Sequence, residues 1–184
     1  IPDGKRNVEF LKDTVRKIVG AICATADMLR EEYPSLHVPM LEKEISFITT
    51  QELEDLYPDK SPKERENLYV REHKTTFLME IGDLLHSGKR HDGRARDYDD
   101  WDLNGDLLFW NEVLDAAMEV SSMGIRVDAR SMDSQLSKAG CDDRRRYHFH
   151  QMVLDNILPL TIGGGIGQSR LCLLLLGKAH IGEV

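Results

Sequence analysis

The sequence predicts a domain of the α+β class, and three observations support this prediction. Hydrophobic residues make up 41% of the 184 residues, which is enough for a core and argues against disorder. Some stretches repeat apolar residues at helical spacing, whereas others are short apolar runs typical of strands. The two kinds of segment follow each other without the regular alternation of a doubly wound fold, so the α+β class fits better.

The first half of the chain is predicted to contain three helices and two strands. The opening helix has an apolar stripe with a residue every three or four positions. The next two helices begin at a capping box and at a Ser–Pro pair, which are typical of helix N-termini. The predicted segments are a helix over 7–33, a strand over 45–49, a helix from Thr49 to about Tyr57, a helix that starts with Ser61 and Pro62, and a buried strand over 75–81.

The second half begins with residues 87–105, a segment dense in charge and glycine that is predicted to be a loop because it is too polar for a core. Apolar runs then predict strands, and Gly124 is expected to break or bulge the second of them. A glycine run follows the last short strand. The predicted segments are strands over 107–114 and 118–123, helices over 131–139 and 142–158, a strand over 160–162 and a helix over 168–176.

Composition excludes several classes of function. There are 24 Lys+Arg against 32 Asp+Glu, a net charge of −8, which rules out nucleic-acid binding driven by net charge alone but not a local basic pocket for a nucleotide. No apolar run approaches the ~20 residues that span a membrane, and no leader pattern is present. The three cysteines lie far apart without a CxxC pattern, so no disulfide framework or zinc site is indicated. We expect a soluble cytoplasmic protein that binds neither nucleic acid nor membrane.

The strongest chemical signal is the segment 161–171, TIGGGIGQSRL, in which a strand runs into glycines and then into a helix. Glycines let a flat ligand approach the backbone, and a helix N-terminus offers free N–H groups to an anion. Arg170 lies in the first turn of an apolar helix that we expect to be buried, so its guanidinium needs an anionic or aromatic partner. The spacing fits neither a P-loop nor a dinucleotide-binding fingerprint. A tight strand–helix joint with a salt-bridged arginine is the alternative.

A second candidate group lies between Glu119 and Arg126. In a strand, Glu119 and Ser121 would share a face. Together with Asp106 they could hold Mg²⁺ against nucleotide phosphates, because hard oxygen ligands suit that ion. The alternative is that Glu119 is an ordinary surface residue.

The polar loop supplies a third and weaker group, in which aromatic residues alternate with charged ones. Mixed charges on a loop are usually just solvated, but exposed aromatic residues between them suggest a wall for a ligand. Histidines 91, 148 and 150 are expected to face solvent or to pack. The residues of the third group are Arg94, Arg96, Asp97, Tyr98, Asp99, Asp100 and Trp101.

Four segments resemble the ammonia-dependent asparagine synthetase family (the A type), which shares its fold with the catalytic core of class II aminoacyl-tRNA synthetases. Weaker similarity runs through the opening helix, residues 46–53 and residues 180–182, so the resemblance covers almost the whole chain. The last of the four segments resembles motif 3 of the class II enzymes. The four segments are 90–101, 103–111, 119–128 and 161–171.

The resemblance implies an antiparallel sheet flanked by helices and an ATP-dependent ligase that forms AMP. The side-chain carboxylate of aspartate would attack the α-phosphate of ATP to give β-aspartyl-adenylate and pyrophosphate, and ammonia would then displace AMP to give asparagine. The resemblance further implies Mg²⁺ as a cofactor, and aspartate, ammonia, ATP and a second copy of the chain in a homodimer as partners.

The resemblance also implies roles for individual residues. Arginines and Mg²⁺ would stabilise the negative charge that develops on the phosphate, and a carboxylate would hold the α-ammonium group of aspartate, the role given to Asp99. The residues assigned are Arg170, Arg126 and Glu119 as catalytic; Asp99, Ser121, Ser122, Gly164 and Gly165 as substrate-binding; Gly163, Gly165, Gly167, Arg170 and Arg126 as nucleotide-binding; and Glu119 and Asp106 as metal ligands.

The chain departs from the resembled family in its length. Family members are longer at the N-terminus and between Trp101 and Leu103, and this chain begins at Ile1 without an initiator Met. We expect residues 1–184 to be a single domain that forms the C-terminal portion of an asparagine-synthetase catalytic domain, with the N-terminal part absent. Such a portion is expected to be inactive alone, because half of the substrate contacts would be missing.

Two other functions remain open at this point. A class II aminoacyl-tRNA synthetase-like paralogue would need a basic face or an anticodon-binding domain, and the net charge counts against it. A non-catalytic module that binds a nucleotide or a partner chain would fit a shortened chain, although the presence of Glu119, Arg126 and Arg170 argues against it.

Overall fold

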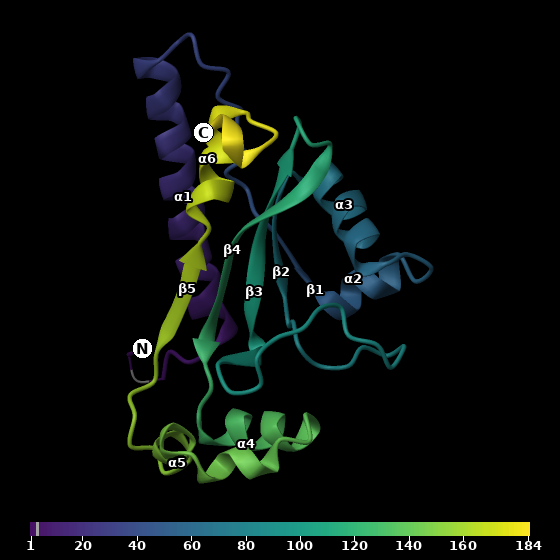
Figure 1. The fold of residues 1–184 in the computed structure, drawn as a ribbon, viewed down its shortest axis with the longest axis vertical. Helices are drawn as coiled ribbons and strands as arrows, with labels where there is room; N and C mark the ends of the chain where they lie inside the picture. The colour runs from purple at the N-terminus through teal and green to yellow at the C-terminus, as the bar shows by residue number, and fades with distance from the viewer. Residues whose placement is uncertain (3) are drawn as a thin grey trace.

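One mixed sheet forms the centre of the computed structural model, which describes residues 1–2 and 4–184 (Figure 1). In this part of the chain, five strands pair in sequence order; the first pair is parallel and the others are antiparallel. The prediction of an α+β fold with a mainly antiparallel sheet is therefore confirmed. The strands are β1 (Ser46–Thr49), β2 (Thr75–Met79), β3 (Asp99–Asn111), β4 (Ala116–Arg126) and β5 (Ile162–Ile166).

Helices cover both faces of the sheet and one of its ends (Figure 1). The long α1 and α6 pack on one face, α2 and α3 pack on the other, and α4 and α5 lie beyond the end where β4 finishes. Within the described residues, no helix has the length and apolar character that crossing a membrane requires. The helices are α1 (Val8–Glu32), α2 (Thr50–Leu56), α3 (Pro62–His73), α4 (Ala129–Lys138), α5 (His148–Leu154) and α6 (Gln168–Leu176), with short 3₁₀ helices η1 (Asp142–Arg146) and η2 (Ile181–Glu183).

The sheet separates two apolar clusters, as strand geometry requires. Phe77 and Leu107 point to the α1 face, and their neighbours Leu78 and Leu108 point to the α2–α3 face. Successive side chains of a strand alternate between faces, so β2 and β3, which are covered on both sides, are apolar on both. The functional groups must therefore lie where this cover ends.

The predicted helix starts of α2 and α3 are confirmed by their caps. The side chain of Thr49 accepts a hydrogen bond from the backbone N–H of Glu52, and Glu52 bonds back to Thr49. Ser61 and Glu64 do the same at α3, with proline in the first turn. These reciprocal bonds satisfy N–H groups that have no partner inside the helix.

The prediction of a loop over 87–105 is wrong in its last third, because β3 begins at Asp99. Three polar residues there, Asp99, Asp100 and Asn104, are buried and have hydrogen-bond or ion-pair partners, whereas Asp102 is exposed. The side-chain amide of Asn104 accepts from the backbone N–H of Ile81 at 3.0 Å and donates to its carbonyl at 2.8 Å, while Asp99 pairs with Arg126. A polarity count cannot detect such long-range partners, which remove the penalty for burying polar groups.

Gly124 does not break β4, which runs on to Arg126, but the β3–β4 register shifts directly beyond it, between Asn104 and Asp99. A Cβ at this position would lie 2.8 Å from Cγ of Asp99 and from Cβ of Asn104, so the glycine is required by close packing against β3. The glycine run predicted to follow a strand over 160–162 is itself the strand β5. The single helix predicted over 142–158 is instead η1 and α5, because Tyr147 is extended with φ −74° and ψ 144°.

Candidate functional site

A hollow of about 440 Å³ opens above β4 and β5, beyond the cover of α2 and α3. We call it the β4–β5 hollow. The three chemical segments of the sequence meet there: the polar loop, the strand that carries Arg126, and the glycine strand. The lining residues are Gly93, Arg94, Ala95, Tyr98, Asp99, Ser122, Arg126, Gly164 and Gly165.

A β-bulge in β4 decides which residues face the hollow. Ser121 lies opposite Leu107 and Glu119 lies opposite Leu108, so one residue of β4 is left over between them. Leu107 belongs to the α1 face, and directly opposed residues point to the same side. Ser121 therefore points away from the hollow, and Ser122 lies on the side of Glu119. The prediction that Glu119 and Ser121 share a face is wrong, because hydrophobic alternation does not reveal the bulge.

Arg94 is a residue of the hollow that the sequence assignments omitted. Its guanidinium donates to Oγ of Ser122 and, at 2.7 Å, to Oδ1 of Asp106. The side chains of Arg94 and Asp106 are 14% and 13% exposed, so this is a largely buried ion pair. The sequence places Arg94 in the weaker third group, where aromatic and charged residues alternate, and assigns it no role of its own.

Arg126 and Asp99 form a second ion pair across the first residues of β3 and the last of β4. The guanidinium also donates to Oη of Tyr98 at 2.9 Å. Burial raises the pKa of Asp99 above its ordinary value, although the charge of Arg126 opposes this effect. Gly163 lies beneath the pair, and a Cβ there would be 2.5 Å from a terminal nitrogen of Arg126. The glycine of β5 thus leaves the space that the guanidinium occupies.

Arg170 and Glu119 form a third ion pair beside the hollow, outside its lining. The guanidinium lies 3.0 Å from Oε1 of Glu119 and donates a hydrogen bond to the Glu119 backbone carbonyl at 3.2 Å, which agrees with the alternative of a salt-bridged arginine. The prediction that α6 is buried all round is wrong, because only Leu174 and Leu175 of this helix are buried. The side chain of Arg170 is 53% exposed, so one side of the guanidinium is open to an anion.

The predicted glycines divide into three situations. Gly164 packs against β4, where a Cβ would lie 2.4 Å from Cβ of Met123. A Cβ on Gly165 would meet open space, so this residue forms bare backbone on the floor of the hollow. The amide of Gly167 donates to the carbonyl of Val120 at 2.9 Å and is therefore occupied.

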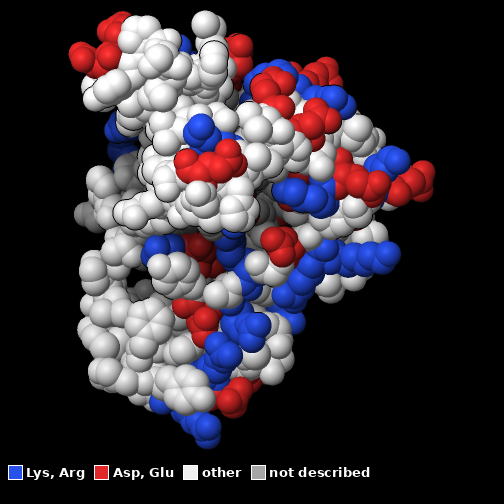
Figure 2. Space-filling view, turned by 45° about the horizontal axis from the view of Figure 1, so that its top comes forward, with Lys and Arg blue, Asp and Glu red and all other residues white. Residues whose placement is uncertain are grey.

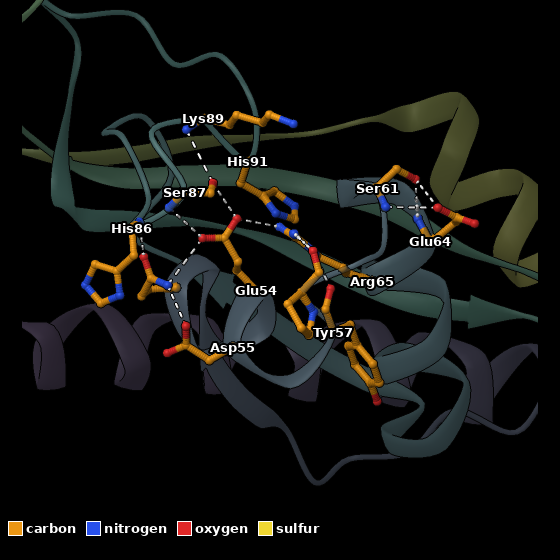
Figure 3. A network of polar contacts seen from close by, with 12 residues as sticks. Glu54, Asp55, Tyr57, Ser61, Glu64, Arg65, His86, Ser87, Lys89 and His91 are labelled. Carbon is orange, nitrogen blue, oxygen red and sulfur yellow. Dashed lines mark hydrogen bonds and ion pairs between the residues drawn. The ribbon is translucent and has the colours of Figure 1, made fainter.

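The loop over the hollow is tied to α2 and α3 (Figure 3). Glu54 accepts hydrogen bonds from the backbone N–H and the hydroxyl of Ser87 at 3.3 and 2.9 Å. Arg65 donates to the same carboxylate at 3.1 Å and to the carbonyls of Tyr57 and Pro58. The close view shows these side chains converging on the start of the loop from two helices. The loop position is thus determined by residues outside the hollow.

Two of the histidines expected to face solvent or to pack are buried, and each also makes a polar contact. His91 is buried against Glu66, and His150 is buried against Asp97. His148 is exposed, as expected. Positive charge is also local in this molecule: Figure 2 shows that, despite a net charge of −8, lysine and arginine side chains gather in a band across one face.

Comparison with known proteins identifies similar chains along the whole length. The model of the AsnA family, described as aspartate–ammonia ligase, matches residues 1–184. The aspartate–ammonia ligase of Bacillus cytotoxicus is 58% identical over 179 residues, which cover 97% of this chain and 54% of the relative. That of Clostridium tetani is 58% identical over 97% of this chain and 52% of the relative. The chain thus spans about half the length of these relatives.

Several solved structures of tRNA synthetases have a similar fold. Asparaginyl-tRNA synthetase from Pyrococcus horikoshii superposes with a TM-score of 0.63 at 16% identity, covering 94% of this chain and 43% of that one. The Entamoeba histolytica asparaginyl-tRNA synthetase in complex with asparaginyl-adenylate gives a TM-score of 0.61 at 15% identity, covering 93% and 42%. At this identity the likeness concerns the fold, which is that of the class II catalytic core.

Proposed function

The chain belongs to the AsnA family of aspartate–ammonia ligases, and from this premise we propose that it forms part of an enzyme that makes asparagine from aspartate, ATP and ammonia. The proposed route is a β-aspartyl-adenylate, with release of AMP and pyrophosphate. One observation carries the proposal: two fixed guanidinium groups, of Arg94 and Arg126, lie with the Asp99 carboxylate around one hollow with a bare-backbone floor. That combination suits a zwitterionic substrate beside a phosphate.

The Asp99–Arg126 pair is the proposed holder of the amino-acid end of aspartate. An α-ammonium group would bind the carboxylate of Asp99, whose side chain is 5% exposed and already paired with Arg126. An α-carboxylate would bind a guanidinium by paired hydrogen bonds, which is the geometry that arginine favours. Of the two serines assigned to the substrate, the β-bulge favours Ser122, whose hydroxyl meets Arg94 on the floor of the hollow.

Adenylation is needed because a carboxylate is a poor acylating agent, and the negative charge that develops on the phosphate requires cations. We assign this task to Arg170, which is half-exposed at the N-terminus of α6, together with Mg²⁺. Glu119 is the proposed metal ligand, since Mg²⁺ binds through one or two carboxylates and substrate phosphates. Both carboxylates are paired with an arginine, but Asp106 fits this role less well, because its side chain is 13% exposed whereas that of Glu119 is 37% exposed. Mg²⁺ would supply charge neutralisation at the phosphates.

The glycines of β5 are the proposed floor for the nucleotide. There is no room for a side chain at Gly163 or Gly164, because a Cβ there would clash with Arg126 or Met123. At Gly165 the backbone faces the hollow without a side chain. A flat base or ribose can approach such a strand closely. Gly167 is proposed to contribute indirectly, by fixing the start of α6 through its bond to Val120.

Residues 1–184 are proposed to be the C-terminal portion of one catalytic domain. The share of the relatives that the chain matches, 54% and 52%, supports the view that it is a portion of a longer protein, and the resemblance of residues 161–171 to motif 3 supports the C-terminal position. The resemblance further supports a cytoplasmic homodimer in which aspartate, ammonia and ATP bind without nucleic acid.

The test of the proposal is a product assay on the intact protein that contains these residues. With ATP, Mg²⁺, aspartate and ammonium, the expected products are asparagine, AMP and pyrophosphate in equal amounts. Formation of ADP and phosphate would contradict the adenylate route. An Arg170→Ala variant is expected to lose about 100-fold or more in kcat while keeping its thermal stability, because an electrostatic contact to the transition state is removed.

The shared fold favours one second candidate, a synthetase-like protein that transfers an aminoacyl group to RNA. Charging of radiolabelled aspartate or asparagine onto bulk tRNA distinguishes it from the ligase. The ligase proposal expects no acid-stable label on tRNA and no change in asparagine formation when tRNA is added.

A further inference from the structure

The segment of residues 91–97 is held at both of its ends by a histidine–carboxylate pair, and Arg94 lies at its middle. At one end His91 bonds Glu66 of α3, and at the other Asp97 bonds His150 of α5. Neither histidine lines the β4–β5 hollow. The two pairs therefore act on the hollow only through the segment between them.

The first pair is almost completely enclosed. The side chain of His91 is 1% exposed, and its Nε2 lies 3.0 Å from Oε1 of Glu66. Burial raises the pKa of Glu66, but the hydrogen bonds and charges of His91 and Lys63 outweigh it and hold the pKa below its ordinary value. The carboxylate is therefore ionised at neutral pH and accepts the Nε2–H of His91. Glu66 is in turn fixed by Lys63, whose Nζ donates to its other oxygen at 2.8 Å.

The second pair joins the other end of the segment to the layer of α4 and α5. Oδ2 of Asp97 accepts a hydrogen bond from Arg144 at 2.6 Å and lies 3.1 Å from Nε2 of His150. Burial raises the pKa of Asp97, but Arg144 and His150 outweigh it and lower the pKa. Asp97 directly precedes Tyr98, a wall of the hollow. The Asp97–His150 pair is thus one residue from the lining of the β4–β5 hollow.

Between the two histidine–carboxylate pairs, residues 91–97 make two contacts that depend on the position of the segment. Arg94 reaches Ser122 and Asp106 with two nitrogens of one planar group, so a shift of the backbone would break at least one bond. The carbonyl of Ala95 accepts a hydrogen bond from the indole N–H of Trp101 at 3.2 Å. The indole is therefore a built-in reporter of where the segment lies.

We propose that His91 and His150 are positioning residues, which fix residues 91–97 and thereby hold the Arg94 guanidinium in the β4–β5 hollow. The catalytic consequence rests on the proposed function, whereas the positional consequence does not. Each histidine binds a carboxylate on another element of the fold, so each bond is directional and links two elements. A packing residue of similar size would fill the space without making that link.

The test replaces each histidine in two ways and measures two quantities on the intact protein that contains these residues. His91→Leu and His150→Leu remove the N–H donor, whereas His91→Gln and His150→Gln keep a side-chain N–H near the position of Nε2. The first quantity is the Trp101 indole N–H resonance, assigned with a Trp101→Phe variant. The second is kcat/KM for asparagine formation.

Each leucine variant is expected to shift the Trp101 resonance and to lower kcat/KM by about 100-fold, the typical effect of a misplacement near 1 Å. The glutamine variants are expected to recover at least a tenfold part of the loss. The indole resonance of Trp110, which lies on the α3 side of the sheet, serves as an internal reference. The matched controls are His148→Leu, on the same helix as His150, and His86→Leu, on the same loop as His91; both histidines are exposed.

Leucine variants that melt at a lower temperature, but keep the Trp101 resonance and kcat/KM unchanged, would overturn the proposal in favour of a merely structural role. If a leucine variant fails to fold, the comparison is made between the glutamine variants and Asp97→Asn or Glu66→Gln, and identical Trp101 resonances in all of them would overturn it equally. If the protein makes no asparagine, the proposed function fails, and the Trp101 resonance still decides the positional claim.

Discussion

The guanidinium of Arg126 lies over the ring of Tyr98, with its central carbon 3.8 Å from the ring centroid. The same group donates to the Tyr98 hydroxyl at 2.9 Å and pairs with Asp99. A ring face and a carboxylate thus hold one cation from two directions. This arrangement fixes the guanidinium before a substrate arrives, and fixed charges stabilise a transition state without reorganising during the reaction.

Replacing Tyr98 separates the two contacts. Tyr98→Phe keeps the ring under the guanidinium and loses only the hydroxyl, so kcat/KM for aspartate is expected to fall by a few-fold. Tyr98→Ala loses both and is expected to lower it by about tenfold or more, since a cation–π contact at a partly exposed site contributes about 0.5–1 kcal/mol. Steady-state kinetics with aspartate as the varied substrate measures the difference. Equal losses in the two variants would contradict a role for the ring.

Gly163 gives a prediction about space. Gly163→Ala would place a Cβ 2.5 Å from a terminal nitrogen of Arg126, so the guanidinium must move. We expect kcat/KM to fall about 100-fold with only a small change in melting temperature, because the misplaced group is at the proposed site. Gly20→Ala is the control: this helical glycine has open space around it, and the variant is expected to be active and about 0.5–1 kcal/mol more stable. Wild-type activity in Gly163→Ala would contradict the proposed role of the Arg126 guanidinium position.

The sequence predicts the helices and the class of the fold well, because these depend on local signals. The caps of α2 and α3 are examples, since Ser61 and Glu64 are three residues apart and contact each other regardless of the rest of the chain. Asp99, Ser122 and Arg126, to which the resemblance assigns substrate or catalytic roles, line one hollow. Contacts between residues close in sequence, and the presence of a motif, can be recognised from the amino-acid sequence alone.

The failures concern residues whose partners are distant in sequence. From polarity alone, Asp99 is predicted to lie in a solvated loop. In the structure it is buried where β3 pairs with Arg126 of β4. The sequence predicts the wrong face for Ser121, because the β-bulge arises from the pairing of β3 with β4 and cannot be read from one strand alone. Arg94 belongs to the third candidate group but is assigned no role from the sequence, because its contacts are with Ser122 and Asp106, which are distant in the chain. Each error has the same cause, a tertiary partner that alternation and charge density do not encode.

The pKa of Glu66 leads to a prediction for stability against pH. Because His91 and Lys63 hold the pKa of Glu66 below its ordinary value of 4.5, the ionised carboxylate stabilises the folded state at neutral pH. That contribution is fully present above pH 4.5 and is lost as the pH falls through the lower folded-state pKa. Glu66→Gln has no such group, so the difference in unfolding free energy between wild type and variant should be largest above about pH 5 and shrink below pH 4. Urea unfolding at a series of pH values measures it, and a difference that grows on acidification would contradict the assigned direction.

The buried pair of Glu54 and Arg65 predicts a non-additive effect on stability. Their side chains are 8% and 7% exposed and 3.1 Å apart, and Glu54 also holds the start of the loop through Ser87. Glu54→Leu leaves the Arg65 charge buried without its carboxylate, which is expected to cost about 3–5 kcal/mol of unfolding free energy. The double variant Glu54→Leu, Arg65→Leu removes both charges and is expected to be more stable than the single one, as paired removal from an interior often is. Asp13→Ala is the control, because its ion pair with Arg16 is exposed and of the kind that contributes less than about 1 kcal/mol. Urea unfolding followed by circular dichroism measures the unfolding free energy of Glu54→Leu, the double variant and Asp13→Ala. If Glu54→Leu loses no more stability than Asp13→Ala, the buried pair does not stabilise the start of the loop at Ser87.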